Sequence, residues 1–349
     1  MRVLITGNLG YVGPVVVEHL RRQLPEAELI GYDSGWFLNC LTTTGRAPET
    51  LLNAQYFGDV RELPAQLLAG VDAVVHLAAV SNDPIGNRFE KVTSDINRSA
   101  SLRLATLAAA AGVRNLVFAS SCSVYGAAGD APRKEGDALN PLTAYARSKV
   151  QTEEGLSQLD LNGMAVTCLR FATACGMSAR LRLDLVLNDF VACALSSGDI
   201  TVLSDGTPWR PLIDVRDMAI AIEWALTRQP EQGGRMLIVN VGSGERNHRV
   251  RELAEAVAAA VPGTRVSINQ AARPDARSYR VDFSLFNKLA PHHQPRHRLQ
   301  DSIAGLVVGL RNIGFNDAEF RKSGRMIRLN ALSAMIDSQQ MSPDLRWRG

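Results

Sequence analysis

The chain has 349 residues, of which 46% are hydrophobic and 21% charged, values typical of a folded globular protein and too apolar for a disordered one. Its net charge of +3 comes from 38 basic and 35 acidic residues without a long basic block, which argues against nucleic acid as the main partner. No run of about 18 apolar residues occurs, so we expect no membrane-spanning helix.

Short apolar strands alternate with helical patterns through the first half of the chain. We expect strands at 2–6, 28–33, 72–77, 115–120 and 165–170, and an alanine-rich helix at 99–112. Such alternation is typical of a parallel sheet covered on both faces, and right-handed crossovers then give an α/β fold with a Rossmann-type doubly wound sheet. Ligands bind these sheets at the carboxyl ends of the strands.

The alternation loosens after about residue 176. Residues 180–184 look irregular, and we expect helices at 185–198, 214–227 and 248–260 and a strand at 236–240. The last 35 residues predict an amphipathic helix whose apolar side contains Met326, Leu329, Leu332, Met335 and Ile336. We expect this helix to cover its own domain, although the basic residues near it could instead serve a partner (Arg321, Lys322, Arg325 and Arg328).

A glycine-rich turn follows the first strand and opens a helix. Its residues are Gly7, Asn8, Leu9, Gly10, Tyr11, Val12 and Gly13. Glycines at this spacing allow a tight turn and let backbone N–H groups approach a pyrophosphate at the positive end of the helix. Asp33 ends the second strand, where a carboxylate accepts from the adenosine ribose hydroxyls and repels a 2′-phosphate. We therefore predict NAD rather than NADP, with Asp59 and Val60 as candidates for the adenine edge.

A phenol and an ammonium lie four residues apart at Tyr145 and Lys149, hence on one face if the segment is helical. A tyrosine with an ordinary pKa of about 10 works as a base near pH 7 only if that pKa falls by about three units. A neighbouring lysine charge, with help from a bound nicotinamide, has this effect. The run from Ser120 to Ser123 follows the fourth strand and offers a hydroxyl to the oxygen whose carbon loses a hydride.

In combination these motifs resemble the extended short-chain dehydrogenases/reductases, specifically their nucleotide-sugar epimerase/dehydratase group. The resemblance rests on 7–13, Asp33, 76–79, 120–126 and 145–149, and it extends from residue 1 to about 290. It implies that Tyr145 is the base, that Lys149 holds the nicotinamide ribose and lowers the pKa of Tyr145, and that Ser121 bonds the reacting oxygen. It also implies further contacts, to the cofactor at Leu77, Ala78, Ala79 and Ser120 and to the substrate at Ser81 and Ser123.

A second match lies in the C-terminal half. Residues 205–217 resemble the family segment whose arginine grips the sugar-nucleotide diphosphate, which gives that role to Arg210, with Arg273 or Arg277 as a second clamp. Asn188 is a further candidate contact to the nucleotide. Thr173 stands where the family often has asparagine, which points to an unusual sugar or sugar substituent.

The resemblance implies that the first step is oxidation at sugar carbon 4. Dehydratases of the family carry Asp-Glu directly after the catalytic Ser/Thr, whereas this chain has Cys122 and Ser123, which replace a paired acid and base poorly. We therefore predict 4-epimerisation through a transient 4-keto sugar. Dehydration or reduction by the same kind of site is the alternative, and a catalytically silent NAD(H)-binding sensor or scaffold is the alternative from another class.

These readings predict two domains. Residues 1–175 would form the NAD-binding domain, with returning segments near 212–242, and 176–349 mainly a smaller α/β substrate domain with a C-terminal helical tail. We expect a nucleotide-diphosphate sugar as substrate, NAD as cofactor, and neither nucleic acid nor membrane as partner. A homodimer would form through the helix at 99–112 and the helix that carries Tyr145. The five cysteines form no CxxC pair, which favours reduced thiols in a cytoplasmic protein without a metal site.

Overall fold

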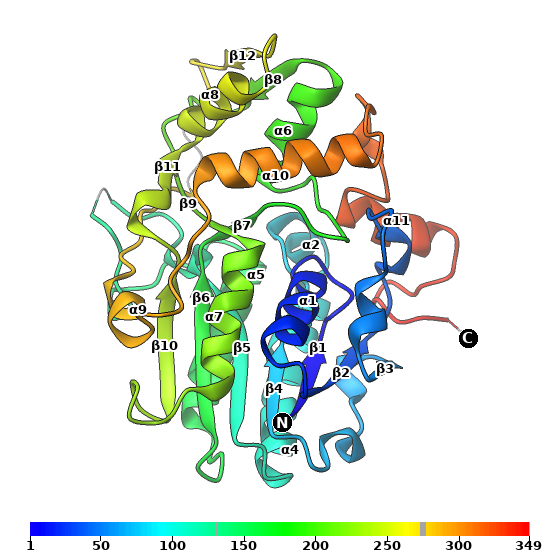
Figure 1. The fold of residues 1–349 in the computed structure, drawn as a ribbon, viewed down its shortest axis with the longest axis vertical. Helices are drawn as coiled ribbons and strands as arrows, with labels where there is room; N and C mark the ends of the chain where they lie inside the picture. The colour runs from blue at the N-terminus through cyan, green and yellow to red at the C-terminus, as the bar shows by residue number, and fades with distance from the viewer. Residues whose placement is uncertain (130, 273–276, 349) are drawn as a thin grey trace.

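The computed structural model describes residues 1–129, 131–272 and 277–348. A seven-stranded parallel sheet runs through the molecule in the order β10-β6-β5-β4-β1-β2-β3 (Figure 1). The strands are β1 Arg2–Thr6, β2 Glu28–Asp33, β3 Ala54–Phe57, β4 Ala73–His76, β5 Asn115–Ser121, β6 Ala165–Phe171 and β10 Met236–Val241. The order reverses between β1 and β4, which confirms the Rossmann-type fold and marks the crevice where ligands of such sheets bind.

Helices cover both faces of this sheet. On one face lie α1 (Gly13–Gln23) and α7 (Val215–Thr227), and on the other α4 (Ser101–Ala110) and α5 (Ala144–Gln158). Alternate residues of one strand point to opposite faces, so Ile5 packs in the first core and Leu4 in the second. Both side chains have no exposed surface. The apolar strands that the sequence shows are therefore buried on two sides.

The expected elements of the first half are present. The five predicted strands match the observed ones to within one residue at each end. The alanine-rich helix starts later than predicted, because a π-helical stretch occupies Asp95–Ala100 and α4 begins only at Ser101. Two short helices, α2 (Asp83–Arg88) and α3 (Glu90–Ser94), precede it.

A smaller α/β region lies beyond the carboxyl ends of the strands, at the top of Figure 1. It contains a three-stranded sheet in the order β11-β9-β7 and a parallel pair of β8 with β12. The elements are β7 Thr173–Cys175, α6 Val186–Ser196, β8 Asp199–Val202, β9 Trp209–Asp214, β11 Asn247–Arg249, α8 Val250–Ala260 and β12 Arg265–Ile268. The sequence predicted α6 and α8 but none of these five strands.

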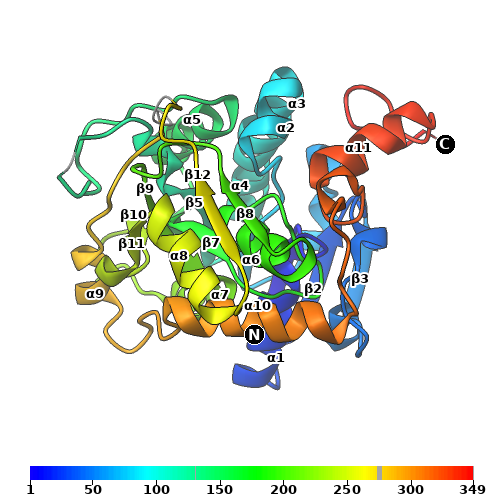
Figure 2. The same cartoon turned by 90° about the horizontal axis from the view of Figure 1, so that it is seen from above.

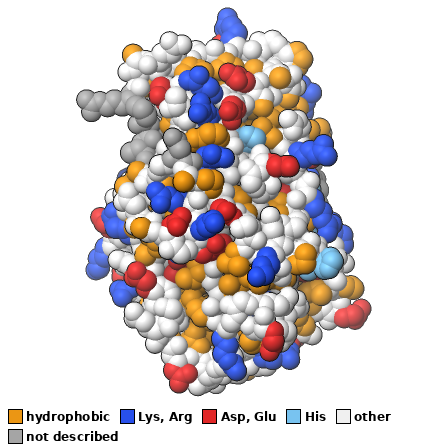
Figure 3. All heavy atoms as spheres, turned by 90° about the vertical axis from the view of Figure 1, so that its left-hand side faces the viewer, with side chains coloured by type: hydrophobic (Ala, Val, Ile, Leu, Met, Phe, Trp, Pro, Cys, Tyr) orange, Lys and Arg blue, Asp and Glu red, His pale blue; other side chains and the backbone are white. Residues whose placement is uncertain are grey.

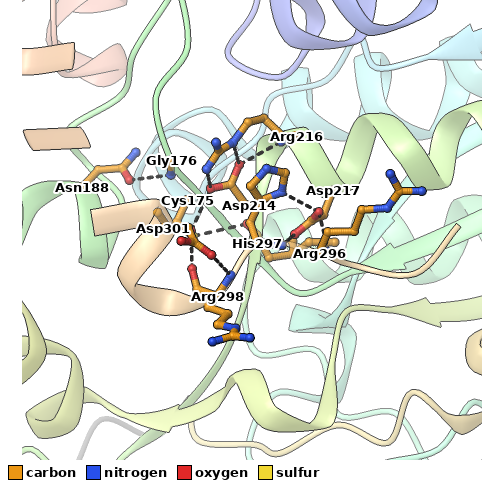
Figure 4. A network of polar contacts seen from close by, with 12 residues as sticks. Cys175, Gly176, Asn188, Asp214, Arg216, Asp217, Arg296, His297, Arg298 and Asp301 are labelled. Carbon is orange, nitrogen blue, oxygen red and sulfur yellow. Dashed lines mark hydrogen bonds and ion pairs between the residues drawn. The ribbon is translucent and has the colours of Figure 1, made fainter. Parts of the chain in front are cut away.

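Two further helices follow, α9 (Ser284–Leu289) and α10 (Leu299–Asn312), and α10 crosses the molecule between the two regions. Polar contacts pin its start to the junction of β9 and α7 (Figure 4). The Asp217 carboxylate accepts from the backbone N–H groups of Arg296 (2.9 Å) and His297 (3.2 Å). Asp214 pairs with Arg216 (2.8 Å) and accepts from Ser302 Oγ (2.7 Å). These contacts fix β9, which carries Arg210, relative to the main sheet.

The predicted tail helix is α11, Arg328–Asp337. Leu332 is buried in an apolar cluster with Val60 and Ile96, so the helix packs on its own chain, but on the N-terminal part and not on the C-terminal part to which we assigned it. The basic residues beside it are engaged within the chain: Arg321 pairs with Asp189 (2.7 Å), and Arg328 is buried.

The surface shows no concentration of one charge on the face that carries α9 and β10, where basic and acidic side chains are interspersed (Figure 3). Within the described part of the chain, no helix combines the length and hydrophobicity needed to cross a bilayer.

Candidate functional site

A cavity of about 710 Å³ opens at the carboxyl ends of the central strands, beside the switch between β1 and β4. Most of the residues predicted for the cofactor and the substrate form its wall. They are Gly7, Gly10, Tyr11, Val12, Gly13, Asp33, Asp59, Val60, Leu77, Ala78, Ala79, Ser81, Ser120, Ser121, Ser123, Tyr145, Lys149, Thr173, Arg210 and Arg277. Segments that are up to 270 residues apart in sequence thus meet in one place.

The glycines of the first turn have different reasons to be glycine. Gly7 has φ = 75°, and a Cβ there would lie 2.5 Å from the backbone nitrogen of Ala78. A Cβ on Gly13 would overlap the carbonyl of Asn8. A Cβ on Gly10 would meet only one neighbouring atom, Gly7 O at 3.2 Å. Gly10 lies in the cavity wall, so the absence of a side chain there widens the cavity. Asn8 itself lies outside the cavity wall and donates to Gln55 Oε1 (2.6 Å).

Asp33 joins the glycine turn to the loop after β2. Its carboxylate accepts from the backbone N–H of Leu9 (3.0 Å) and of Gly35 (2.8 Å). Burial raises the pKa of Asp33 above its ordinary value, although these two N–H donors oppose the rise. Leu9 therefore contributes through its backbone, and its side chain is buried away from the cavity.

Asp59 and Val60 follow β3 at the edge of the cavity. Asp59 begins a short 3-10 turn by accepting from the backbone N–H of Arg61 (2.9 Å), and it also accepts from the Arg61 side-chain Nε (2.9 and 3.0 Å). Both oxygens of Asp59 are thus held by Arg61 at this edge.

Ser121 and Tyr145 lie together at the centre of the cavity. Ser121 is the last residue of β5, and Tyr145 lies in the first turn of α5, whose start is capped by the Thr143 hydroxyl (3.2 Å to Ala146 N). The Ser121 hydroxyl lies close enough to Tyr145 to lower the pKa of the phenol. Burial nevertheless raises the pKa of Tyr145 to about 12, because Ser121 and the charge of Arg182 only partly oppose the rise.

Lys149 lies one turn further along α5 and is buried. Its Nζ donates to the carbonyl of Ala119 (2.7 Å) and lies 5.6 Å from the centre of the Tyr145 ring. Burial lowers the pKa of Lys149 to about 8, although the Glu153 carboxylate opposes the shift. We expected Lys149 to lower the pKa of Tyr145. In the polypeptide alone, burial outweighs any such effect and the Tyr145 pKa is raised.

A buried network that the sequence analysis missed holds this helix in place. Glu153 follows Lys149 by one turn and pairs with Arg170 of β6 (2.7 Å). Glu153 also accepts from the hydroxyl of Ser120 in β5 (2.5 Å). The spacing of Lys149 and Glu153 on one helix face was the available signal. Ser120 therefore contacts the helix as well as the cavity.

Another part of the cavity wall is rich in arginine. Arg182 is buried, forms a two-bond pair with Asp184 (2.9 and 3.0 Å) and donates to Ser81 Oγ (2.9 Å). Arg277 pairs with Asp83 (2.7 Å). Arg210, from β9, donates to the carbonyl of Trp209 (2.9 Å).

Ser123, Thr173 and Tyr279 also line the cavity. The Oγ of Ser123 is buried and has no hydrogen-bond partner among the described residues. Tyr279 is buried, and the Thr173 hydroxyl beside it lowers the pKa of the Tyr279 phenol, although burial raises this pKa overall. Arg182, Asp184 and Tyr279 were not predicted, because they come from segments without a recognisable pattern.

Asn188 lies behind the cavity wall. Its side chain has no exposed surface and is absent from that wall. Its Oδ1 accepts from the N–H of Gly176 (3.1 Å), and its Nδ2 donates to Tyr11 Oη (3.0 Å) and to the carbonyl of Arg182 (2.9 Å). These bonds join site loops to α6, and the contact of Asn188 with a nucleotide stays a prediction. Arg273 lies outside the described residues.

The side chains of His76 and Cys122 form hydrogen bonds within the protein. The His76 ring is hydrogen-bonded to Thr6 Oγ1 (2.6 Å) and Ser101 Oγ (2.7 Å). Cys122 is fully buried, and its thiol donates to the carbonyl of Arg170 (3.0 Å). Burial raises the pKa of Cys122, so the thiol stays protonated at neutral pH.

Comparison with known proteins agrees with this geometry. The pattern of the "NAD dependent epimerase/dehydratase family" matches residues 3–242, more than half of the chain. The protein belongs to this family. Its cofactor is NAD, and its wider class is that of the nucleotide-sugar epimerases and dehydratases.

The individual relatives share about 30% of their residues with this chain or fewer. A UDP-glucose 4-epimerase from Streptomyces lividans is 30% identical over 278 residues, which cover 73% of this chain and 80% of the relative. The structure of a UDP-glucose 4-epimerase from Stenotrophomonas maltophila, with bound NAD and formylated UDP-arabinopyranose, is 27% identical. It has a TM-score of 0.75 and covers 90% of this chain and 99% of its own.

The NAD-dependent hexosamine 5,6-dehydratase TunA has a TM-score of 0.77 at 24% identity, covering 91% of this chain and 99% of its own. At that identity the likeness concerns the fold alone. The fold therefore does not select between epimerase and dehydratase.

The residues of the first turn fit NAD. The open side of Gly10 faces the cavity, and among the described residues no side chain caps the N-terminus of α1. Backbone N–H groups at such an end bind phosphate oxygens. Asp33 and Asp59 line the same cavity, as the prediction for the adenosine part of NAD requires.

Proposed function

We propose that this protein is an NAD-dependent nucleotide-sugar 4-epimerase. The observation that carries the proposal is the pair of residues after Ser121. Cys122 is a buried thiol bonded to a backbone carbonyl, and Ser123 is a neutral hydroxyl. The family resemblance leads us to expect an acid and a base at these positions in a dehydratase. Epimerisation needs neither, because the hydride returns to the carbon that lost it.

The other carboxylates of the cavity wall near Tyr145 are already held. Asp83 pairs with Arg277 and accepts from Thr143 Oγ1 (2.7 Å). Asp184 pairs with Arg182 and accepts from Asn82 (2.6 Å). Burial raises the pKa of Asp184, but the charge and hydrogen bonds of Arg182, together with the charge of Arg328, outweigh burial and the net pKa is lowered. A carboxylate held in this way is a poor proton donor, which again favours epimerisation over dehydration.

We assign the proton transfer to Tyr145. Its phenol lies beside Ser121, so both hydroxyls can bond the oxygen on the reacting sugar carbon, with Tyr145 taking the proton. Bound NAD supplies the hydride acceptor. Lys149 is placed to hold the nicotinamide ribose and to add positive charge near Tyr145, which offsets the burial that raises its pKa.

The substrate is a nucleotide-diphosphate sugar in this proposal. Arg210 and Arg277 bind its phosphates, and Ser81, Ser123 and Thr173 face the sugar. The Arg277–Asp83 ion pair is partly exposed, and such pairs contribute only about 0–1 kcal/mol to the stability of a protein. Arg277 can therefore leave the Asp83 carboxylate and bind a phosphate at little cost in free energy. The relatives named as UDP-glucose 4-epimerases support a UDP-sugar.

Several coarser proposals go with this function. Residues 1–175 with 212–242 form the NAD-binding domain, and most of 176–349 forms the substrate domain and tail. A homodimer forms through α4 and α5. A cytoplasmic location is supported by the five cysteines, all of which are buried free thiols.

The test is a panel of UDP-, dTDP-, GDP-, ADP- and CDP-sugars incubated with the protein in D₂O without added cofactor. Mass spectrometry and proton NMR should show a product of unchanged mass with carbon 4 inverted and no deuterium on carbon, because the hydride returns from NAD. A product that has lost water would identify a dehydratase. A product changed by two hydrogens would identify a dehydrogenase or reductase. Tight NAD binding without turnover of any sugar would favour the sensor.

A further inference from the structure

The last residues of the chain lie along the edge of the cofactor site. The segment 339–347, called here the C-terminal clasp, follows α11 at the red end of the ribbon (Figures 1 and 2) and contacts the loops after β2 and β3. Met341 and Leu345 of the clasp have no exposed surface. They belong to the same apolar cluster as Val60 and Ile96, two residues of the cavity wall. The clasp is therefore packed against the site, although it is the end of the chain.

The clasp is tied to the loop after β3 through Arg61. The guanidinium of Arg61 donates to the carbonyls of Asp344 (2.9 Å) and Leu345 (3.1 Å). The same group holds both carboxylate oxygens of Asp59, as described above. A second ion pair joins Arg346 to Glu62 (2.5 Å). One buried side chain thus connects the clasp with the residue predicted at the adenine edge.

The clasp is also tied to the loop after β2. The indole Nε1 of Trp347 donates to the carbonyl of Ser34 (2.6 Å), the residue after Asp33. Further along this loop, the guanidinium of Arg328 in α11 lies 4.6 Å from the ring centre of Phe37, which is part of the cavity wall. The C-terminal residues therefore fasten both loops that border the adenosine end of the cavity.

The backbone of the clasp is itself under constraint. Leu345 has φ = 55°, in the left-handed region that leucine rarely adopts. Its side chain is fully buried and its carbonyl accepts from Arg61, so the surrounding contacts determine this conformation.

We propose that the C-terminal clasp is part of the NAD site and controls release of the cofactor. The adenosine leaves only when the loops after β2 and β3 separate, and the contacts of Trp347 and Arg61 oppose that separation. This inference rests on the proposed placement of adenosine between Asp33 and Asp59. It also fits an epimerase, which returns the hydride to the same sugar and needs no exchange of NAD between turnovers.

The test measures the release of NADH from the loaded full-length protein, followed by the loss of bound-NADH fluorescence after addition of excess NAD. Trp347→Phe keeps an aromatic ring but removes the indole donor, and it should speed release about two- to tenfold, the range for one hydrogen bond. A chain that ends at Ser338 should release NADH more than tenfold faster. Arg348→Ala is the matched control, since that neighbouring side chain is exposed, and should release NADH at the wild-type rate.

The possible results distinguish an error in the role of the clasp from an error in the placement of adenosine. Trp347 is about half exposed, so Trp347→Phe should fold even if the shortened chain does not. Wild-type release from Trp347→Phe would overturn the role of the clasp. Equal acceleration by Arg348→Ala would overturn it too, because the effect would not depend on these contacts. If Asp33→Asn leaves NAD affinity unchanged, the placement of adenosine is wrong, whatever the clasp variants show.

Discussion

The part of the cavity around Tyr145, called here the catalytic end, is held by a buried ion pair, whereas Arg277, which we propose binds phosphate at the substrate end, forms an exposed one. Ser121, Tyr145 and Lys149 lie on β5 and α5, and Glu153 and Arg170 anchor that helix through a buried ion pair. At the other end, Arg277 and Asp83 form a pair in which the arginine is 46% exposed. Exposed ion pairs contribute little to stability and exchange partners easily. Removing one partner of a buried ion pair, in contrast, lowers the stability of the protein by several kcal/mol. The comparison indicates a rigid catalytic end and a substrate end that rearranges around its ligand.

The largest effect should come from Tyr145→Phe. The substitution keeps the ring and removes the hydroxyl that takes the proton, so turnover should fall about 10²- to 10⁴-fold, the usual contribution of a positioned base. NAD content should stay at the wild-type level, because the ring still fills its place. The measurement is kcat together with the NAD released on denaturation. Unchanged turnover would remove the proposed mechanism.

Arg210→Ala tests the substrate end. Loss of a charged hydrogen bond to a phosphate costs about 1.5–3 kcal/mol, so KM for the nucleotide sugar should rise about ten- to a hundredfold. We expect kcat to change much less, since in the proposal Arg210 binds a phosphate and takes no part in the proton transfer. Arg265→Ala is the control, because that arginine is 81% exposed and pairs with Asp199. A fall in kcat with unchanged KM would contradict the proposal that Arg210 binds the nucleotide sugar without taking part in the chemical step.

The sequence predicted the catalytic end better than the substrate end for a physical reason. The glycine turn and the Tyr145–Lys149 pair depend on spacing within one element, and that spacing fixes their geometry. Arg182 depends instead on contact with Ser81, which is 101 residues away, and its own segment has no regular structure. Nothing in the local pattern could place it in the cavity.

The bonds of Asn188 could not be read from the sequence. The amide is buried in α6 and joins two segments through Gly176 and Tyr11, the latter 177 residues away. The helix α10 was missed although a signal existed. Its buried residues Leu299, Ile303, Leu306 and Leu310 recur at helical spacing.

A pH experiment tests the rigidity of the catalytic end. Burial, helped by the charge of Lys149, lowers the pKa of His76 from 6.5 to about 3. Between these values the unfolded chain binds a proton that the folded chain does not. The free energy of unfolding should therefore fall as the pH drops below 6.5, by up to about 1.4 kcal/mol per pH unit.

Urea unfolding at a series of pH values measures this slope. His76→Gln should lower stability at neutral pH, because it disturbs the bonds to Thr6 and Ser101, but should flatten the dependence between pH 6 and 4. The exposed His292→Gln should keep the wild-type slope. Parallel curves for His76→Gln and the wild type would show that this histidine is not held neutral by the fold.

The smallest effect, and the finest contrast, concerns two serines near the end of β5. Ser120 donates to the buried Glu153, so Ser120→Ala should lower the free energy of unfolding by about 1–3 kcal/mol. The Ser123 hydroxyl has no partner among the described residues, so Ser123→Ala removes no internal bond and should leave that free energy within about 0.5 kcal/mol of wild type. If Ser123 faces the sugar as proposed, kcat/KM should still fall severalfold in Ser123→Ala. Equal loss of stability in both variants would mean that the Ser123 hydroxyl stabilises the fold as Ser120 does. Ser123 would then belong to the catalytic end and not to the substrate end.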